Sequence, residues 1–267
     1  MIAILGAGKM GEALMSGLLG SGTDPSTVLI TEPRDDHAAQ ISAKYGVEAV
    51  PADVAVTRAD TVILAVKPQS MSALLREVAP LVRDDQLLVS IAAGISTESV
   101  ERHLSTAGRK AAVVRAMPNT PALVGQGMTA IAGGTHALEE HLDQARRLLE
   151  TVGEVVRVAE SSMDAVTALS GSGPAYFYLM VESMVDAGVL EGLPRDTAER
   201  LVVQTISGAA AMLRESGDDA VVLRRNVTSP AGTTAAALRE LERSGFRSAV
   251  ASAIEAARNR GHQLSRE

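Results

Sequence analysis

The spacing of apolar residues changes near residue 160. Before it, short apolar and β-branched runs alternate with segments whose apolar residues recur every three or four positions. The short runs predict strands and the others helices, as in repeated βαβ units. A fully apolar run such as 61–66 requires a sheet covered on both faces. We therefore predict an α/β domain, a Rossmann-like doubly wound sheet, over 1–160. Its strands are expected at 2–6, 27–31, 47–50, 61–66, 86–92, 111–117, 128–133 and 154–159.

After residue 160 only the helical spacing continues. It runs through 161–193, 194–217 and 231–261, with Gly or Pro at the breaks. These helices are rich in alanine, and only 2% of the whole chain is aromatic, so they have little bulk with which to fill a core. We predict that 161–267 is an all-helical substrate-binding and dimerisation domain that packs against another copy of the chain.

Composition narrows the class of partner. A chain of 267 residues suits two modest domains, and its net charge of -7 disfavours nucleic acid or an anionic membrane as the main partner. There are no cysteines, which excludes disulfide frameworks and thiolate metal sites. No apolar run reaches the roughly 18 residues that span a bilayer, and the N-terminus lacks the basic start of a signal peptide. We expect a cytoplasmic protein that acts on a small molecule.

A glycine motif, GAGKMG, follows the first predicted strand and opens a helix. In the G-x-G-x-x-G pattern, Gly6 makes the turn, Gly8 lets the backbone approach a pyrophosphate, and Gly11 lets helix and strand pack closely. The helix N-terminus then faces the phosphates with free N–H groups. A glycine turn without a ligand is the alternative. The predicted cofactor residues here are Gly6, Ala7, Gly8, Lys9, Met10 and Gly11.

The second predicted strand ends with residues that bear on the choice of cofactor. An acidic residue at this place, Glu32, commonly holds the ribose 2′-hydroxyl of NAD, whereas a nearby arginine, Arg34, can hold the 2′-phosphate of NADP. Either side chain could also be a solvated surface charge. Because both are present, these residues leave the choice open.

Loops after the later strands lie where open α/β sheets bind ligands, beyond the carboxyl ends of the strands. AVKPQ follows the fourth strand, SIAAG ends the fifth, and RAMPNTPALVG follows the sixth. An exposed lysine beside a helix start and a rigid proline connector are the alternatives. The predicted cofactor residues in these loops are Ala65, Val66, Lys67, Pro68, Ala92, Ala93, Gly94 and Asn119.

Histidine offers no obvious chemistry. His136 and His141 are five residues apart, which places them about 140° apart around a helix, so they do not form a metal site of the H-E-x-x-H kind. His37, His103 and His262 stand outside any cluster of catalytic residues in the sequence. We predict neither a metal nor histidine acid–base catalysis.

Two hydroxyl-rich stretches interrupt the helical part. In 169–178, LSGSGPAYFY, Gly and Ser allow close backbone approach, although a plain helix–helix turn fits equally well. In 227–234, VTSPAGTT, several hydroxyl residues crowd a helix start. N-capping by Thr228 or Ser229 would use one of them, whereas an anion held at the helix N-terminus would explain more.

Taken together, these stretches resemble pyrroline-5-carboxylate reductases. The matching segments run in the family's order over nearly the whole chain: GAGKMGEAL, AVKPQ, SIAAGI, RAMPNTPALVG, DAVTALSGSGPAYFY and VTSPAGTTAAALRELERSGFRSAV. The resemblance implies reduction of 1-pyrroline-5-carboxylate to L-proline, the last step of proline biosynthesis, with NADPH favoured and NADH possible. Ala231 departs from the family's more frequent glycine, which should stiffen the turn.

The resemblance also implies roles for single residues. Backbone N–H groups around Gly232, Thr233 and Thr234 would hold the substrate carboxylate, with Ser229 in the same turn, and the hydroxyl of Thr234 would face the ring nitrogen. Glu160 is expected near the substrate amine. Asn226 is expected to touch the cofactor.

Two other functions stay open. A β-hydroxyacid type of dehydrogenase would typically use a lysine of the second domain, yet no lysine follows Lys110. A non-catalytic NADPH sensor would leave the hydroxyl-rich helix start unexplained.

Overall fold

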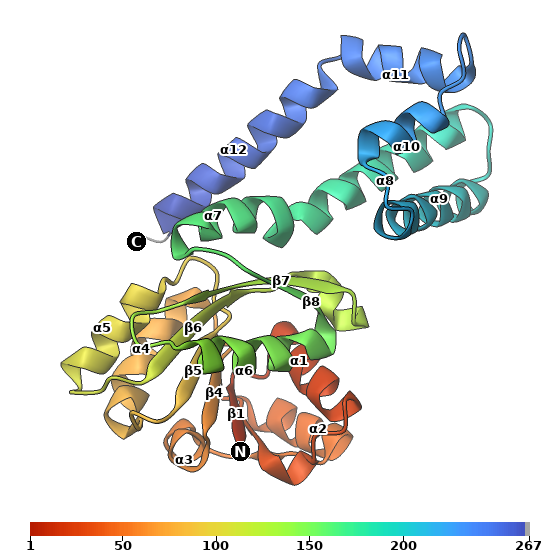
Figure 1. The fold of residues 1–267 in the computed structure, drawn as a ribbon. Coiled ribbons are helices and arrows are strands. Elements are labelled where there is room, and N and C mark those ends of the chain that lie inside the picture. Colours follow the sequence, from red (N-terminus) through yellow and green to blue (C-terminus); the bar gives the residue numbers. More distant parts are fainter. Residues whose placement is uncertain (265–267) are drawn as a thin grey trace. The chain divides into compact units, whose positions relative to one another are not determined.

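The computed structural model describes residues 1–264. Within it the chain forms two compact units. The first comprises Met1–Ser172 together with the chain from Ala257 onward, and the second comprises Gly173–Ala256 (Figure 1). The predicted functional boundary at residue 160 remains a proposal.

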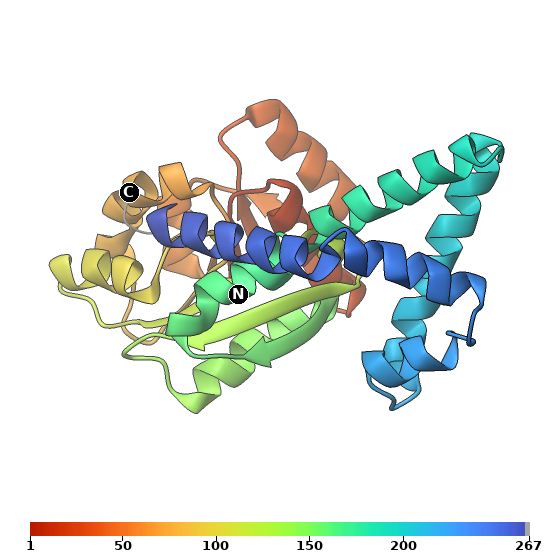
Figure 2. The ribbon, with the colours of Figure 1, turned by 90° about the horizontal axis from the view of Figure 1, so that it is seen from above.

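The first unit is built on an eight-stranded sheet. Its order is β3-β2-β1-β4-β5-β6-β7-β8, and all neighbours are parallel except β6 and β7. The outer strands β7 and β8 lie side by side in both views (Figures 1 and 2). Each strand falls where the apolar runs predict it, which confirms the doubly wound fold. The strands are β1 Ile2–Leu5, β2 Val28–Thr31, β3 Glu48–Ala49, β4 Thr61–Leu64, β5 Leu87–Ser90, β6 Ala112–Met117, β7 Gly127–Gly133 and β8 Gly153–Arg157.

Helices cover both faces of this sheet because strand side chains alternate between two apolar cores. Ile4 belongs to the core that includes Leu14 of α1, and its neighbour Leu5 to the core that includes Leu75 of α4. Helices α1, α2 and α6 contribute to the first core, and α3, α4 and α5 to the second. Their bounds are α1 Lys9–Gly20, α2 Asp35–Tyr45, α3 Ala52–Arg58, α4 Pro68–Val78, α5 Thr97–Thr106 and α6 Glu139–Leu149. Short turns of helix lie at Pro25–Thr27, Ala79–Leu81, Thr120–Val124, Glu150–Val152 and Glu160–Ser162.

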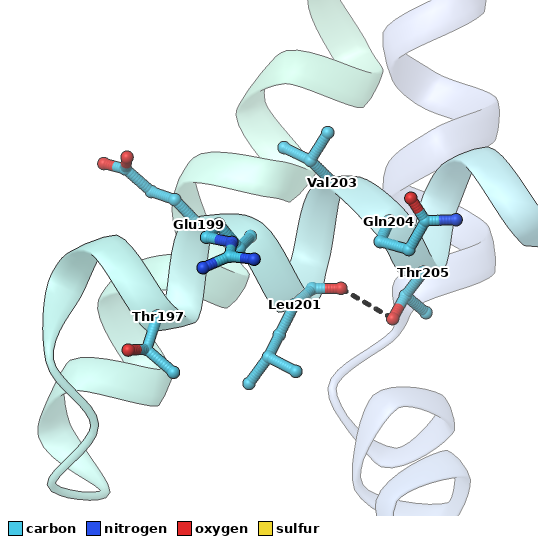
Figure 3. A pocket seen from close by; sticks show the side chains of 7 residues that line it. Thr197, Glu199, Leu201, Val203, Gln204 and Thr205 are labelled. Atoms are coloured by element: carbon cyan, nitrogen blue, oxygen red, sulfur yellow. Dashed lines mark hydrogen bonds between the residues drawn. The ribbon is translucent and has the colours of Figure 1, made fainter.

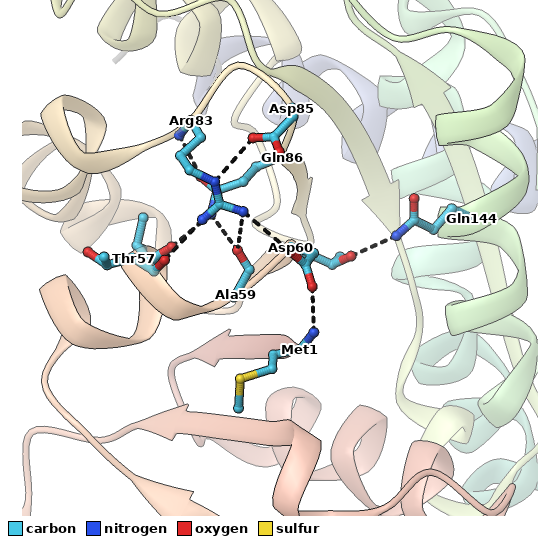
Figure 4. Close-up of polar contacts among 10 residues, drawn as sticks. Met1, Thr57, Ala59, Asp60, Arg83, Asp85, Gln86 and Gln144 are labelled. Carbon is cyan, nitrogen blue, oxygen red and sulfur yellow. Dashed lines mark hydrogen bonds and ion pairs between the residues drawn. The ribbon is translucent and has the colours of Figure 1, made fainter.

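A polar network closes the edge of the sheet at which β1, β4 and β5 begin (Figure 4). The N-terminal ammonium of Met1 donates to Asp60 at 2.7 Å, and this contact lowers the pKa of Asp60. Arg83 reaches the same carboxylate at 3.3 Å, and buried Gln86 donates to the carbonyl of Ala59 at 2.6 Å. The network thus joins the chain segments that precede these strands.

The rest of the chain is helical, as predicted. Helix α7, Met163–Val166, continues into a wider π-helical turn at Thr167–Gly171. The second unit contains α8 Gly173–Leu190, α9 Arg195–Glu215, α10 Ala220–Asn226, α11 Thr233–Arg243 and the first part of α12 Phe246–Leu264. Among the described residues, no helix is long and apolar enough to cross a membrane.

Candidate active site

The glycine turn between β1 and α1 has the geometry that its sequence predicts. Gly6 has a φ of 114°, and a Cβ there would lie 2.7 Å from the carbonyl oxygen of Ala65. A Cβ on Gly11 would overlap the carbonyl oxygen of Gly6. Gly8 is the N-cap of α1, and a Cβ on it would meet nothing within 4 Å. Gly6 and Gly11 are therefore required by the fold, whereas Gly8 faces open space beside a helix N-terminus.

The other predicted loops lie at the same edge, because the strands β2, β1, β4, β5 and β6 are neighbours and run parallel. Lys67 is the N-cap of α4, with Pro68 in its first turn. After β5, Ala92 is buried, and Gly94 has a φ of 76° that favours glycine. The fold thus brings the predicted cofactor residues of the first domain to one edge of the sheet.

Glu32 and Arg34, at the end of β2, hold each other. One oxygen of Glu32 accepts from the backbone N–H of Arg34 at 3.2 Å and from its Nε at 2.9 Å. The other oxygen lies 3.1 Å from Nδ1 of His37, which is also 3.0 Å from Nη2 of Arg34. The hydrogen bond from Arg34 lowers the pKa of Glu32, whose side chain is only 6% exposed. Arg34, in contrast, remains 65% exposed and can reach a ligand.

A cavity of about 570 Å³ opens beside this cluster. Its acidic lining residues are Glu32, Asp35 and Glu77, and most of the remaining lining is apolar. A flat, largely apolar group such as adenine suits such a lining. The apolar lining residues are Pro33, Ala38, Ala49, Val50, Pro51, Ala52, Val66, Ala73 and Leu74.

The side chain of Asn119 is engaged within the protein. Its carbonyl oxygen accepts from the backbone N–H of Met128 at 2.9 Å, and its amide donates to the carbonyl oxygen of Ser170 at 3.2 Å. Asn119 thereby joins the loop after β6 to the π-helical turn. Its backbone carbonyl oxygen is engaged as well, because it accepts from the backbone N–H of Ala122 at 3.1 Å.

The start of α11 answers the question of the crowded hydroxyl groups. Ser229, Pro230, Ala231 and Gly232 form a turn closed by the Gly232 N–H and the Ser229 carbonyl oxygen at 3.1 Å, with Ala231 at a φ of 57°. A proline followed by a residue with positive φ is typical of a type II turn. Gly232 is the N-cap of α11 and offers no side-chain hydrogen bond. The hydroxyl of Thr228 instead donates to the carbonyl of Arg224 at 2.6 Å.

N-capping by Thr228 or Ser229 is therefore wrong as an explanation of this segment. The turn delays the helix start to Thr233, so the hydroxyls of Thr233 and Thr234 lie in its first turn and no side chain caps it. Because the N–H of Gly232 closes the turn, the backbone donors left at this helix start begin at Thr233. Such a start is suited to bind an anion.

Among the described residues, neither the histidines nor the acidic side chains form a second site. His141 accepts from the backbone N–H of Leu138 at 3.0 Å and so helps to cap α6. Within residues 1–264, no group of three or more His, Cys, Asp or Glu side chains could hold a metal ion. A hollow of about 700 Å³ on the second unit is lined by α9 alone (Figure 3). There Leu201 and Val203 are exposed beside Thr205, whose hydroxyl bonds back to its own helix.

One buried group was missed by the sequence reasoning. Arg115 lies in the middle of β6, an otherwise apolar and fully buried strand, and its guanidinium pairs with Glu160 at 2.8 Å. The signal available in the sequence was a lone charge within AAVVRAM. A charge is rarely buried unless it is paired, so it pointed to a partner elsewhere in the chain.

The fold and site define a Rossmann-type, dinucleotide-dependent oxidoreductase with a helical second domain. Comparisons with known proteins identify the family. Residues 160–264 match the model of pyrroline-5-carboxylate reductase dimerisation, and residues 1–94 match that of NADP oxidoreductase, coenzyme F420-dependent. The chain belongs to the pyrroline-5-carboxylate reductase family, because named members align with it over nearly its whole length.

The relatives and solved structures agree. The pyrroline-5-carboxylate reductase of Corynebacterium melassecola is 43% identical over 99% of this chain and 98% of its own, and that of Pseudomonas aeruginosa is 42% identical over 100% and 97%. The Coxiella burnetii structure superposes with a TM-score of 0.93 at 35% identity, over 98% of this chain and 97% of the other. The Plasmodium falciparum enzyme with NADP bound gives 0.88 at 30% identity, over 99% and 97%.

A β-hydroxyacid type of dehydrogenase shares the fold alone. The Mycobacterium tuberculosis 3-hydroxyisobutyrate dehydrogenase superposes with a TM-score of 0.53 at 21% identity, over 71% of this chain and 65% of the other. The lysine expected of that class has no counterpart after Lys110.

Proposed function

We propose that this protein reduces 1-pyrroline-5-carboxylate to L-proline with NADPH. The observation that carries the proposal is the start of α11, where a proline turn, an uncapped helix N-terminus and two threonines follow one another. The substrate is a small cyclic imine with one carboxylate, and this segment offers N–H donors for the carboxylate and a hydroxyl for the ring nitrogen. The full-length likeness to named pyrroline-5-carboxylate reductases supports the assignment.

The residues at the sheet edge fit a dinucleotide. Open space at Gly8, beside the N-terminus of α1, suits the pyrophosphate, for which Lys9, Met10 and Gly11 supply the first turn of the helix. The cavity beside Glu32 suits adenine. NADPH, when bound, supplies a hydride from C4 of its nicotinamide. The loops Ala65–Pro68 and Ala92–Gly94, with Asn119 and Asn226, complete the proposed cofactor site.

Arg34 supports NADPH over NADH. Its guanidinium is held in place by Glu32 and is exposed, so it can hold a 2′-phosphate. One oxygen of Glu32 already accepts two hydrogen bonds from Arg34, which weakens that carboxylate as a partner for the 2′-hydroxyl of NADH. We therefore propose NADH as the less favoured of the two cofactors.

For the substrate, we assign the backbone N–H groups of Thr233 and Thr234 to the carboxylate, with Ser229 beside them. Gly232 leaves room for the hydroxyl of Ser229, which a Cβ on Gly232 would overlap. The hydroxyl of Thr234 would orient the ring nitrogen, and Glu160 would lie near it. As the hydride arrives, the imine nitrogen must be protonated or hydrogen-bonded. Solvent can supply the proton, so positioning is the main task of the protein.

We also propose that the chain works as a homodimer or larger homo-oligomer in the cytoplasm, whose reducing conditions suit a protein without cysteines. The match of 160–264 to a dimerisation family supports self-association. So do the many large apolar side chains that the second unit exposes.

The direct test is imine-dependent oxidation of NADPH, and separately NADH, followed by loss of absorbance with purified protein and 1-pyrroline-5-carboxylate. We expect fast oxidation, faster with NADPH, and accumulation of proline. Tight binding of NADPH without oxidation would instead favour a dinucleotide sensor.

Thr234→Ala tests the assigned role of the hydroxyl. Losing one hydrogen bond to the reacting nitrogen should lower turnover about 10- to 100-fold, with affinity for NADPH nearly unchanged. Thr234→Ser keeps the hydroxyl and is the matched control. If turnover and NADPH affinity fell together in Thr234→Ala, the residue would belong to the cofactor site.

A further inference from the structure

Arg115 is an unusual residue for its place in the fold. Every residue of β6 is buried, and the Arg115 side chain is 4% exposed. Its partner across the strand pair is Ser90, the last residue of β5, so both side chains project from the same face of the sheet. Guanidinium remains charged at any ordinary pH, and a buried charge is costly unless it is paired. The chain therefore keeps a permanent positive charge directly beneath the ligand-binding edge.

Glu160 is the partner that compensates this charge, and it makes a second contact. Its Oε1 accepts from Nη1 of Arg115 at 2.8 Å and lies 3.4 Å from the backbone N–H of Thr97. Thr97 is the first residue of α5, where a carboxylate is also favoured by the helix dipole. One carboxylate oxygen thus joins the middle of β6 to the start of α5.

The segment held in this way is the loop between β5 and α5, residues 91–96. Its first residue, Ile91, donates to the carbonyl of Leu64 at 3.1 Å, and Ser96 at its other end caps α5. Between these ends lie Ala92, Ala93 and Gly94, which we assigned to the cofactor. Glu160 therefore limits how far the carboxyl-terminal end of this loop can move relative to the sheet.

Stability alone is a poor explanation of the pair. Nε and Nη2 of Arg115, Oε2 of Glu160 and Oγ of Ser90 are buried and have no hydrogen-bond partner among residues 1–264. A partly satisfied polar cluster is worth less to folding than a well-packed apolar one of the same volume. The cluster does fix the orientation of the three elements that it joins, which are β6, the turn Glu160–Ser162 and the start of α5.

We propose that Arg115 is a positioning residue for hydride transfer. Through Glu160 it fixes the start of α5, and with it the Ala92–Gly94 loop against which the nicotinamide end of the cofactor is placed. The proposal rests on the proposed reductase function. It differs from a role of Glu160 in substrate binding alone, because it makes Arg115 and Glu160 act as one unit on the reaction step.

The test compares Arg115→Met, Glu160→Gln and the double variant with the wild-type protein, whose imine-dependent NADPH oxidation is measured first. Because the pyrophosphate and adenine sites are untouched, we expect the Kd for NADPH to change less than about threefold, while kcat falls about 10- to 100-fold through misplacement of the reacting groups. The two single effects should not add in the double variant. With NADPH deuterated at the transferred C4 position, the isotope effect on kcat should rise, which a purely structural role would not cause.

Two further variants complete the design. Arg115→Lys keeps a charge that can reach Glu160 and should recover part of the lost turnover, and it serves as the second probe if Arg115→Met does not fold. Arg157→Met removes an exposed ion pair of 2.6 Å with Glu139 in the same unit, and should behave like the wild type.

Three outcomes would overturn the proposal. One is normal turnover in folded Arg115→Met. Another is a Glu160→Gln variant that raises KM for the imine while Arg115→Met changes neither KM nor kcat, which would show that Glu160 acts on the substrate without Arg115. The third is additive single effects. A wild-type protein that oxidises no NADPH would count against the proposed function itself, and is distinguished by that first measurement.

Discussion

The two compact units differ in where their apolar side chains end up. The first unit buries both faces of its sheet under helices and so contains two complete cores. The second buries only a small cluster, in which Val185, Ala198 and Val202 join α8 to α9. Of the 24 large apolar side chains that are exposed in the described chain, 17 lie in Gly173–Ala256. The first unit is stabilised from within, whereas the second carries apolar surface of the kind that a partner covers.

The largest effect should come from breaking this exposed face. Leu201, 53% exposed on α9, becomes a carboxylate in Leu201→Asp. If a second copy covers this face, burying the unpaired charge costs about 3 to 5 kcal/mol, enough to weaken association more than about 100-fold. Sedimentation should then show smaller species, and thermal unfolding of the second unit should occur at a lower temperature.

The matched control lies in the first unit. Leu138 is 60% exposed at the N-cap of α6, where aspartate is a favoured residue. Leu138→Asp should leave both the assembly and the unfolding temperature intact. An unchanged assembly in Leu201→Asp would show that this face of α9 is not the contact between copies.

The next largest effect is expected in the first unit, at two glycines of the turn between β1 and α1. In Gly11→Ala, the new methyl group overlaps the carbonyl of Gly6, so we expect a loss of about 1 to 3 kcal/mol of stability together with NADPH binding. In Gly8→Ala, the methyl group meets no protein atom within 4 Å, so stability should be unchanged while NADPH binding weakens. Calorimetry and NADPH titration separate the two.

A third glycine in the same helix is the control. A methyl group on Gly20 would also meet nothing within 4 Å, but this residue lies at the far end of α1. Gly20→Ala should keep NADPH affinity and, if anything, stabilise the helix. Equal NADPH affinity in Gly8→Ala and Gly20→Ala would show that the pyrophosphate does not bind at the first turn of α1.

Local patterns predicted the elements of both units because the spacing of apolar residues within each strand or helix follows the repeat of that element. They predicted the glycine turn because its requirements are also local: Gly6 and Gly11 leave no room for a Cβ beside neighbouring backbone, and Gly8 leaves open space at the helix N-terminus. They did not predict the pairing of Arg115 with Glu160, which are 45 residues apart and meet only through the order of the strands.

Side-chain competition set a second limit on prediction. The sequence presents Glu32 and Arg34 as alternative cofactor ligands, but the structure shows that each is the other's partner. Likewise, the capping rule points to Thr228 or Ser229, whereas the turn at Pro230 moves the helix start beyond both. In each case several donors compete for one acceptor. The backbone geometry decides which donor lies within hydrogen-bond distance.

A smaller effect is expected at Arg34. It concerns the choice of cofactor and the dependence of stability on pH. Arg34→Ala removes the side chain that we propose as the partner of the 2′-phosphate, and it should lower kcat/KM for NADPH about tenfold or more, with little change for NADH. The variant also removes the main cause that lowers the pKa of Glu32. Because that pKa is depressed in the folded protein, the stability it provides is present above the unfolded value, about 4.3, and is lost as pH falls through the folded value.

Thermal unfolding at several pH values checks this linkage. The wild-type protein should be more stable than Arg34→Ala at neutral pH, and the difference should shrink in acid, once Glu32 is protonated in both. Arg34→Lys keeps a positive charge without the planar fork and should lie between the two in NADPH preference. A difference in stability that persists unchanged in acid would separate Arg34 from the charge of Glu32.

The smallest effect is expected at Ala231, in the turn that precedes α11. Ala231 adopts a φ of 57°, a left-handed conformation that costs a residue with a side chain about 1 to 2 kcal/mol. Ala231→Gly removes this strain but adds about 0.4 to 1 kcal/mol of unfolded-chain entropy, so the net gain in stability should be about 1 kcal/mol or less. Ala231→Val, which adds a branched side chain at positive φ, should be clearly destabilising.

The same substitution bears on the substrate. Pro230 and Ala231 together restrict the turn that presents the start of α11, and a more mobile glycine there would have to be ordered when the carboxylate binds. We therefore expect Ala231→Gly to raise KM for 1-pyrroline-5-carboxylate slightly, with kcat and NADPH affinity unchanged. A lower KM in Ala231→Gly would mean that alanine holds the turn away from its binding geometry.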